Sequence, residues 1–202
     1  IDATSSSIEV SDVFVDDFGY RGLYSEAADL TVDGSVFIGD SPTVIATAYI
    51  GIATAGARNR ITNNLVNGFS LGIDHLGTGV GVIIQGNTII LPQGLDVGIY
   101  LVEGDQGIIS NNYIECTATA AQCLLQYGIK ISSSTKTVDG PVIANNTLVK
   151  VQIGLQQSIG AVVEGNTIQG AIINMSVVAG ETVKDARIVN NTIVNTTDPG
   201  AA

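Results

Sequence analysis

The sequence is poor in charged residues. Its 202 residues include 8 Lys and Arg against 19 Asp and Glu, so the formal net charge is −11. Eight scattered cations cannot form the basic stripe of a nucleic-acid-binding protein. No apolar run reaches the roughly 18 residues that a membrane-spanning helix needs. Hydrophobic residues nevertheless make up 45% of the chain and the mean hydropathy is +0.37. These values exclude a disordered chain and predict a single folded domain over residues 1–202.

Soft metal ligands are equally scarce. The chain has one His, one Met and two cysteines, Cys116 and Cys123. There is no Cys-x-x-Cys motif and no Cys/His cluster, so neither a zinc site nor a role in metal delivery is expected. The two cysteines lie in a stretch of small residues and can close a local disulfide, which would indicate an oxidising compartment. The alternative is a pair of buried thiols on adjacent strands.

Acidic residues occur in two groups that contain oxygen ligands suited to calcium. No EF-hand spacing and no Asp-rich nonapeptide repeat accompanies them, so solvated surface charge is the favoured interpretation. No cofactor is predicted, and calcium remains the one ion to consider. The groups are Asp12, Asp16 and Asp17, and Asp29, Asp33 and Asp40.

A repeated motif runs along the whole chain. Its clearest copies are residues 84–89 (IQGNTI), 163–168 (VEGNTI) and 189–193 (VNNTI). Weaker copies complete a series of anchors at positions 12, 35, 64, 87, 112, 146, 166 and 191. The intervals between anchors range from 20 (146 to 166) to 34 (112 to 146). Regular spacing of this kind indicates a solenoid of stacked repeats.

A second landmark, Gly followed by an aliphatic residue, lies between the anchors, so each repeat holds two or three short β-rich runs. No helical period intervenes, which excludes a doubly wound α/β sheet. The pattern predicts an all-β, right-handed parallel β-helix of about eight coils, with stacked Ile, Val and Leu inside and Asn side chains at the bends. The longest interval predicts an excursion loop around residues 115–126. The landmark glycines are Gly22, Gly51, Gly72, Gly98, Gly128 and Gly154.

The Asn-Asn-Thr-Ile and Gly-Asn-Thr-Ile anchors resemble those of the right-handed parallel β-helix superfamily. That group includes pectate-lyase-like enzymes, mannuronan epimerases, copper-maturation periplasmic proteins and phage tailspikes. The resemblance covers nearly the whole chain and implies the fold rather than any one member. Members often begin with an amphipathic capping helix, whereas neither end of this sequence shows an obvious terminal cap. We therefore expect a segment of a longer protein or an assembling subunit, a homo-oligomer in the form of a trimer or an end-to-end stack. The alternative is that unrecognised loops cover the ends.

The residue after each landmark aliphatic is expected to point outward. This column contains Asp74, Tyr100 and Lys130 in consecutive coils, about 5 Å apart, and the only histidine, His75, follows Asp74. Together these groups could support proton abstraction beside a carboxylate, with Lys130 neutralising the substrate and Tyr100 and His75 as acid/base candidates. The alternative is a solvated polar column. The predicted column reads Tyr24, Ala53, Asp74, Tyr100, Lys130, Gln156 and Asn174.

The resemblance extends faintly to this site. Residues 72–75 (GIDH) are similar to the Asp-Pro-His element of mannuronan epimerases, but the proline is missing. Glycoside hydrolysis would instead need two carboxylates roughly 5–9.5 Å apart. Glu103 or Asp105 could supply one partner for Asp74, although the residues around them are also typical of an ordinary turn.

Sugar-binding surfaces usually offer aromatic platforms, and this chain has no Trp and six Tyr. The six tyrosines would have to serve, and the net charge of −11 disfavours strongly anionic glycans. The sequence thus favours an extracellular, cell-surface or virion-borne β-helix that binds or cleaves a polysaccharide, as a lyase, epimerase or hydrolase if it is an enzyme. The alternative is a structural or filament-forming solenoid that assembles through its ends. The tyrosines are Tyr20, Tyr24, Tyr49, Tyr100, Tyr113 and Tyr127.

Overall fold

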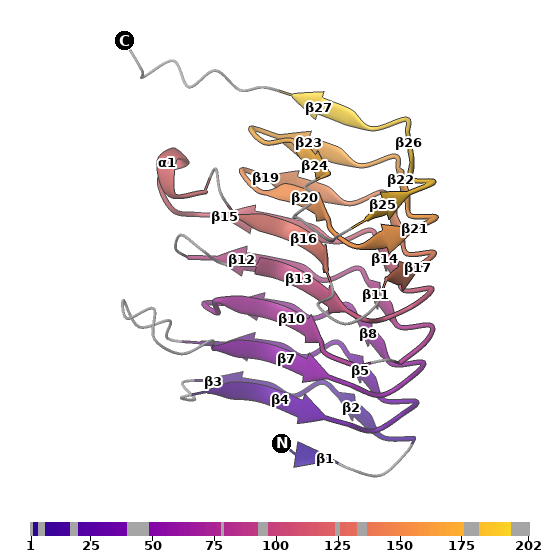
Figure 1. The fold of residues 1–202 in the computed structure, drawn as a ribbon. Coiled ribbons are helices and arrows are strands. Elements are labelled where there is room, and N and C mark those ends of the chain that lie inside the picture. Colours follow the sequence, from indigo (N-terminus) through magenta and orange to yellow (C-terminus); the bar gives the residue numbers. More distant parts are fainter. Residues whose placement is uncertain are drawn as a thin grey trace.

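The chain forms a stack of β-strand coils in a computed structural model, which describes residues 2–3, 7–16, 20–39, 49–77, 79–92, 97–123, 126–132, 137–175 and 182–194. Three parallel sheets of eight strands each run along the stack, and successive coils rise from β1 to β27 (Figure 1). Strands pair in parallel with their equivalents in the neighbouring coils, as in β7–β10–β13. The predicted right-handed parallel β-helix is therefore confirmed.

Each coil contributes one strand to each sheet. Sheet A contains β1 (Asp2–Ala3), β4 (Arg21–Ser25), β7 (Ile50–Thr54), β10 (Leu71–His75), β13 (Val97–Val102), β16 (Tyr127–Ser132), β20 (Gln152–Leu155) and β24 (Ile173–Met175). Sheet B contains β2 (Glu9–Ser11), β5 (Thr31–Asp33), β8 (Arg60–Thr62), β11 (Ile83–Gln85), β14 (Ile108–Ser110), β18 (Val142–Ala144), β22 (Val162–Glu164) and β26 (Arg187–Val189).

The third long sheet and two small elements complete the coils. Sheet C contains β3 (Phe14–Asp16), β6 (Val36–Ile38), β9 (Leu65–Asn67), β12 (Thr88–Leu91), β15 (Tyr113–Cys116), β19 (Thr147–Val149), β23 (Thr167–Gln169) and β27 (Thr192–Val194). A short sheet D is formed by β17 (Val138–Asp139), β21 (Ser158–Ile159) and β25 (Val183–Lys184), and α1 spans Ala120–Cys123.

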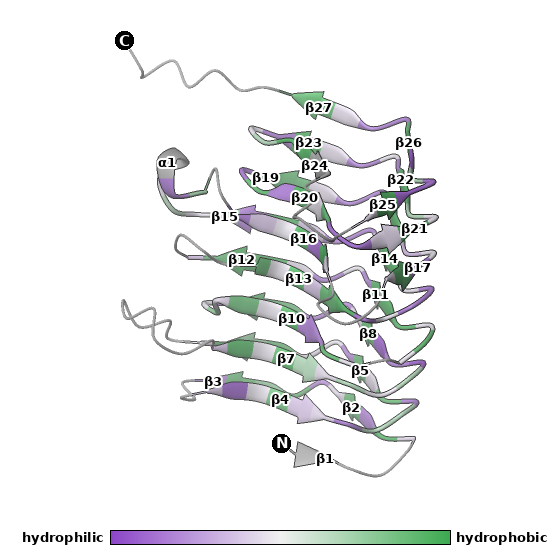
Figure 2. Ribbon diagram, viewed as in Figure 1, coloured by the Kyte–Doolittle hydropathy of each residue, from purple (hydrophilic) through white to green (hydrophobic). Residues whose placement is uncertain are grey.

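The interior consists largely of stacked aliphatic side chains from all three long sheets. In sheet B the middle residue of each strand points inward, and Ile61, Ile84 and Ile109 in consecutive coils are fully buried. Strand residues alternate between interior and exterior, and Figure 2 shows hydrophobic residues on strands throughout the stack. The predicted inward columns of Ile, Val and Leu are confirmed.

The anchor asparagines form a continuous side-chain ladder at the bend between sheets B and C. In each step the Asn Oδ1 of one coil accepts hydrogen bonds of 2.9–3.0 Å from the backbone N and the Nδ2 of the preceding anchor. The asparagine side chains thus lie at the bends, as the sequence predicted, and they also bond to one another from coil to coil. Its members are Asn64, Asn87, Asn112, Asn146, Asn166 and Asn191, and Ser35 precedes them.

The first anchor is displaced by one residue from the sequence prediction. Val13, not Asp12, occupies the anchor position, because the Val13 backbone N donates to Ser35 Oγ at 3.2 Å. Asp12 instead matches Gly34, one position earlier in the next coil, and both residues have positive φ.

Two columns of left-handed residues bracket sheet B, and neither column was predicted from the sequence. The second member follows the first by five residues in every coil, as at Arg58 and Asn63. A left-handed residue turns the chain sharply, which is why Gly, Asn and Asp fill most of these positions. The first column contains Ser7, Asp29, Arg58, Gly81, Gln106, Gly140, Gly160 and Asp185; the second contains Asp12, Gly34, Asn63, Gly86, Asn111, Asn145, Gly165 and Asn190.

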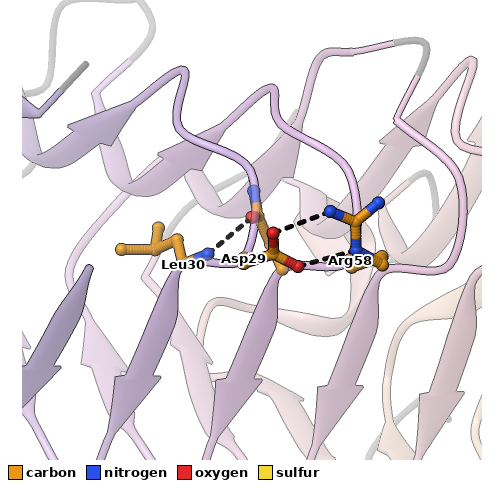
Figure 3. A network of polar contacts seen from close by, with 4 residues as sticks. Asp29, Leu30 and Arg58 are labelled. Atoms are coloured by element: carbon orange, nitrogen blue, oxygen red, sulfur yellow. Dashed lines mark hydrogen bonds and ion pairs between the residues drawn. The ribbon is translucent and has the colours of Figure 1, made fainter. Parts of the chain in front are cut away.

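Polar contacts tie consecutive coils together at the first of these columns (Figure 3). Arg58 Nε and Nη2 donate to the two carboxylate oxygens of Asp29, each at 2.7 Å, and this contact lowers the pKa of Asp29. Beside it, the Leu30 backbone N donates to Asn59 Oδ1 at 3.0 Å. One of the acidic residues considered as a calcium ligand is thus paired with the next coil.

The predicted excursion loop carries α1 and a disulfide. Cys116 at the end of β15 and Cys123 at the end of α1 are joined, with their Cα atoms 5.9 Å apart. Both side chains are buried within the hydrophobic core cluster. The disulfide interpretation is confirmed, and the alternative of two free thiols on adjacent strands is wrong.

Candidate functional site

The expected outward column lies on sheet A, with its members in register. Tyr24 pairs with Ala53, Ala53 with Asp74, Asp74 with Tyr100 and Tyr100 with Lys130, on consecutive strands β4, β7, β10, β13 and β16. Parallel strands are separated by about 4.8 Å, so Asp74, Tyr100 and Lys130 occupy adjacent steps of the ladder. The structure therefore brings these three predicted residues together.

The column does not continue to Gln156. The pairing of β16 with β20 shifts between Tyr127 and Ile129, so Lys130 pairs with Gly154, which pairs in turn with Asn174. Gly154 thus occupies the outward position, where an added Cβ would lie only 2.3 Å from Tyr127 Cε1. In this coil the glycine follows the buried aliphatic residue instead of preceding it, and the Tyr127 ring lies directly beside it. The sequence pattern could not show that shift.

Lys130 lies against two tyrosine rings, and we call these three residues the Lys130 cluster. Its Nζ is 5.0 Å from the ring centroid of Tyr100 and 5.4 Å from that of Tyr127. Both distances are within the range of cation–π attraction. The sequence pattern did not assign Tyr127 to this face. Its position directly before the landmark Gly128 marks a second outward column.

A similar cluster, which we call the Arg21 cluster, consists of Arg21 and Tyr24 of β4 and of Tyr20 directly before it. The Arg21 guanidinium carbon is 4.4 Å from the Tyr24 ring centroid and 5.0 Å from that of Tyr20. Arg21 also directly precedes a landmark glycine, so it belongs to the same second column as Tyr127. The two clusters gather four of the six tyrosines on one face. They lie toward the two ends of a span from β4 to β16, which is four strand steps or about 19 Å long.

Asp74 lies between the clusters and is almost inaccessible to solvent. The residue is 2% exposed, and Oδ1 has no hydrogen-bond partner among the described residues. Burial raises the pKa of Asp74 to about 7, against an opposing attraction from the Arg21 guanidinium. Small Ala53 occupies the step between them. Asp74 is therefore a carboxyl group that titrates near neutral pH, a property common at functional sites.

The structure corrects the placement of His75. Side chains alternate along β10, so His75 points into the core while Asp74 points outward, and the ring is fully buried. Its Nδ1 lies 2.9 Å from Thr54 Oγ1 of the preceding coil. Burial lowers the pKa of His75 to about 4, with the Gly79 backbone opposing the shift. A neutral imidazole in the interior cannot share an outer face with Tyr100 and Lys130, so the prediction that these groups lie together is wrong.

The two further carboxylates lie in the turn after β13. Glu103 has a left-handed backbone with a φ of 62°. Asp105 Oδ1 accepts a hydrogen bond of 2.9 Å from the Asp139 backbone N, which links two coils. The turn interpretation therefore describes the structural role of Asp105. That Glu103 acts with Asp74 in catalysis stays a prediction.

The acidic groups considered for calcium are dispersed. Asp29 is paired with Arg58 of the next coil. Asp33 likewise accepts hydrogen bonds from the Thr62 hydroxyl and from Asn63 Nδ2 of the next coil. Asp17 and Asp40 lie outside the described residues. Across the part of the chain that the structure describes, no group of three or more His, Cys, Asp or Glu side chains could hold a metal ion. None of the described helices is long and apolar enough to cross a membrane.

Comparison with known proteins agrees with this architecture. A family model described as a right-handed beta helix region matches residues 1–168. The last coil, which contains β24, β26 and β27, continues the same stack beyond the matched region. A search of curated proteins finds no match to the chain.

Proposed function

The chain belongs to the right-handed β-helix family, whose fold is consistent with proteins that bind or degrade polysaccharides, and we propose that it binds a polysaccharide along the outer face of sheet A. The observation that carries this proposal is the gathering of four tyrosines and two cations on one face, around a buried carboxyl group. Sugar sites combine apolar ring faces with a few placed polar groups, and this face offers both.

Each component has a distinct task in the proposed complex. The rings of Tyr100 and Tyr127 pack against the apolar faces of sugar rings, and Lys130 donates hydrogen bonds to hydroxyl or isolated carboxylate oxygens. Asp74 is buried beneath this face, so it acts on the complex through its charge, which is absent when the carboxyl group is protonated and negative when it is ionised. The net charge of −11 repels densely anionic chains, so the ligand is a neutral or sparsely charged glycan.

The proposed location is outside the cell or on a virion surface. A disulfide within the fold, Cys116–Cys123, supports an oxidising environment. Polysaccharides of cell surfaces are encountered there.

The test is a glycan-array screen followed by calorimetry on the best ligand. We expect Tyr100→Ala and Lys130→Ala to weaken binding at least tenfold. The control is Tyr113→Ala, which removes another partly exposed tyrosine, but from the outer face of sheet C, and it should bind like the unmodified protein. Equal affinity in all four proteins would overturn the assignment to sheet A, and the absence of any bound glycan would overturn the proposed function.

The same samples test for catalysis. Glycans recovered after incubation are analysed for shortened chains, unsaturated ends or changed stereochemistry. Any such product that disappears in Asp74→Asn, while the variant keeps its fold, would convert the binding site into an active site. Unchanged glycans leave the protein a binding module.

A further inference from the structure

Two columns of residues run side by side along the bend between sheets B and C, and asparagine is common in both. The ladder asparagines, such as Asn146, are buried. The residue directly before each ladder position lies at the edge of the stack and has positive φ. Asparagine occupies four of these positions, and all four, which we call the edge asparagines, are exposed. They are Asn63, Asn111, Asn145 and Asn190.

The residue two positions after an edge asparagine decides whether an N-linked glycan can be attached to it. Enzymatic N-glycosylation requires the sequence Asn-x-Ser/Thr, in which x is not Pro. Asn145 and Asn190 have Thr at that position, so both satisfy the requirement. Asn63 and Asn111 have Leu and Tyr there, so they do not.

The register of the coils separates the edge asparagines from the ladder. Two positions after each ladder asparagine comes the apolar middle residue of a sheet C strand, such as Leu148 after Asn146. Two positions after an edge asparagine comes the residue that begins the strand and points outward, such as Thr147. The core needs an aliphatic side chain at the first of these positions, whereas the second is free to carry a hydroxyl group.

The amide nitrogen of Asn145 has room for a bulky substituent. The side chain is exposed and makes no hydrogen bond with the described residues, while the backbone N donates to the Glu164 carbonyl at 3.0 Å. An added Cβ at Gly165 of the next coil would collide with Asn145 Oδ1, so the oxygen of the amide lies over that glycine. The nitrogen is the other branch of the same planar group and is directed away from Gly165.

A glycan on the neighbouring ladder residue would disrupt the fold. Asn146 Nδ2 donates to the Ile109 and Ala144 carbonyls and to Asn166 Oδ1, at 2.9–3.1 Å. A bond from this nitrogen to a sugar would remove a donor and place a large polar group in a buried position. The edge amide carries no such burden, because none of the described residues is bonded to its nitrogen.

We propose that Asn145 and Asn190 are acceptors for N-linked glycans when the chain passes through a secretory compartment that contains an oligosaccharyl transferase. The amide nitrogen displaces a lipid diphosphate from the anomeric carbon of a lipid-linked oligosaccharide. The C–N bond forms, the C–O bond to the diphosphate breaks, and the amide releases one proton, with no oxidation or reduction. The Cys116–Cys123 disulfide supports passage through such an oxidising compartment.

The two acceptors share one edge of the stack. Asn145 directly precedes the bend into β19, and Asn190 the bend into β27, two coils later, so the acceptors are about 10 Å apart along the stack. This edge joins sheets B and C, and sheet A does not border it. The proposal is therefore independent of the glycan-binding site on sheet A.

Site-specific mass spectrometry on protein from glycosylating cells tests the proposal. The chain is fused to a signal peptide, secreted and retained protein are both analysed, and a known glycoprotein of the same cells is the reference. N-glycosidase leaves Asp in place of each glycosylated Asn, so every position is assigned separately. We expect glycans at positions 145 and 190 and none at 63 and 111. An unmodified Asn145 and Asn190 beside a glycosylated reference would overturn the proposal.

The remaining sequences of this type do not affect the outcome. Asn174 and Asn195 also begin an Asn-x-Ser/Thr sequence. The side chain of Asn174 and the whole of Asn195 lie outside the described residues, and their peptides are assigned separately.

Two variants at one strand position test the role of the hydroxyl group. Thr147→Val keeps a β-branched side chain on sheet C, and it should abolish the glycan on Asn145 while Asn190 stays modified. Tyr113→Thr completes the required sequence after Asn111, whose φ of 55° and exposure match those of Asn145, so Asn111 should become a further acceptor. A glycan that persists on Asn145 in the first variant, or an unmodified Asn111 in the second, would overturn the proposal.

The denaturation midpoint tests whether this edge accommodates the glycans. Because the side chains of Asn145 and Asn190 make no hydrogen bond within the described part of the chain, the glycosylated protein should unfold at the same midpoint as Thr147→Val or at a higher one. A lower midpoint in the glycosylated protein would contradict the exposed placement of the amide nitrogens.

Discussion

Removal of one amide from the middle of the asparagine ladder should destabilise the whole protein. Asn112 is 1% exposed and joins three coils. Its Oδ1 accepts from the backbone N and the Nδ2 of Asn87, at 2.9 and 3.0 Å. Its Nδ2 donates to the Ile84 carbonyl and to Asn146 Oδ1, at 3.0 and 2.9 Å. Asn112→Ala removes all four bonds while leaving the backbone in place.

The size of the effect follows from what is left unpaired. Asn87 Nδ2 keeps its bonds to two carbonyls, and Asn146 Oδ1 keeps the bond from the Asn112 backbone N. The Asn87 backbone N–H loses its ladder acceptor in a buried position, and the Ile84 carbonyl loses one donor. A buried polar group without a partner costs about 1–3 kcal/mol. We expect Asn112→Ala to lower the free energy of unfolding by about 2–5 kcal/mol.

The assay is equilibrium unfolding in urea, followed by circular dichroism. The matched control is Asn111→Gly, which changes the same residue type one position earlier, where the side chain is exposed and φ is +55°. Glycine adopts that conformation freely, so the control should unfold within about 1 kcal/mol of the original protein. If the two variants lost equal stability, or if Asn112→Ala lost less than about 1 kcal/mol, the ladder would not stabilise the fold as argued.

Three further changes test the interior. Gly104→Ala would place a Cβ 2.9 Å from His75 Cδ2, so it should lower the free energy of unfolding by about 1–3 kcal/mol in urea, and an unchanged midpoint would contradict this packing. Replacing Cys116 and Cys123 together by Ala should cost about 2–3 kcal/mol through loss of loop closure, and reductant should then have no further effect on unfolding. Asp74→Asn should change the pH dependence of the free energy of unfolding. The pKa of Asp74 is raised to about 7, so in the original protein the contribution of Asp74 to stability falls as pH rises from about 4 to 7. The pKa of His75 is lowered from 6.5 to about 4, so the contribution of His75 to stability grows as pH rises over the same window. The two slopes nearly cancel, and in the variant the free energy of unfolding should rise by about 3 kcal/mol between pH 4 and 6.5; a flat profile in the variant would refute this balance.

The fold was predictable because its determinants repeat. Each coil must bury one short strand from each sheet and turn at fixed points, so the same residue types recur at the same places. Asn87 and Asn112 show this directly, since each is held by the coil on either side. A pattern that recurs in eight coils is far more informative than any single motif.

The candidate site was only partly predictable, because it depends on departures from the repeat. Strand alternation placed Asp74, Tyr100 and Lys130 correctly, yet the same rule places His75 inside, and its proximity to Asp74 in sequence was misleading. A register shift puts Gly154 beside Lys130, and the Tyr127 ring of the preceding coil leaves no space for a side chain at Gly154. Such a contact between coils cannot be read from spacing along the chain. Cation–π contacts depend on side-chain direction across strands, which spacing along the chain does not specify.

The neighbours Asp74 and His75 show how one strand separates two chemical roles. Both are ionisable and both are buried, so desolvation favours the neutral form of each, which raises the pKa of an acid and lowers that of a base. His75 faces the interior, where the Thr54 hydroxyl hydrogen-bonds one ring nitrogen. Because the ring is neutral, no charge is buried in the core. Asp74 lies between the tyrosine clusters, where a buried carboxyl group that changes charge near pH 7 alters the electrostatic potential at the proposed site. If the glycan site lies there, affinity must vary with pH in the original protein and lose that variation in Asp74→Asn, because the raised pKa of Asp74 makes its charge change near neutral pH.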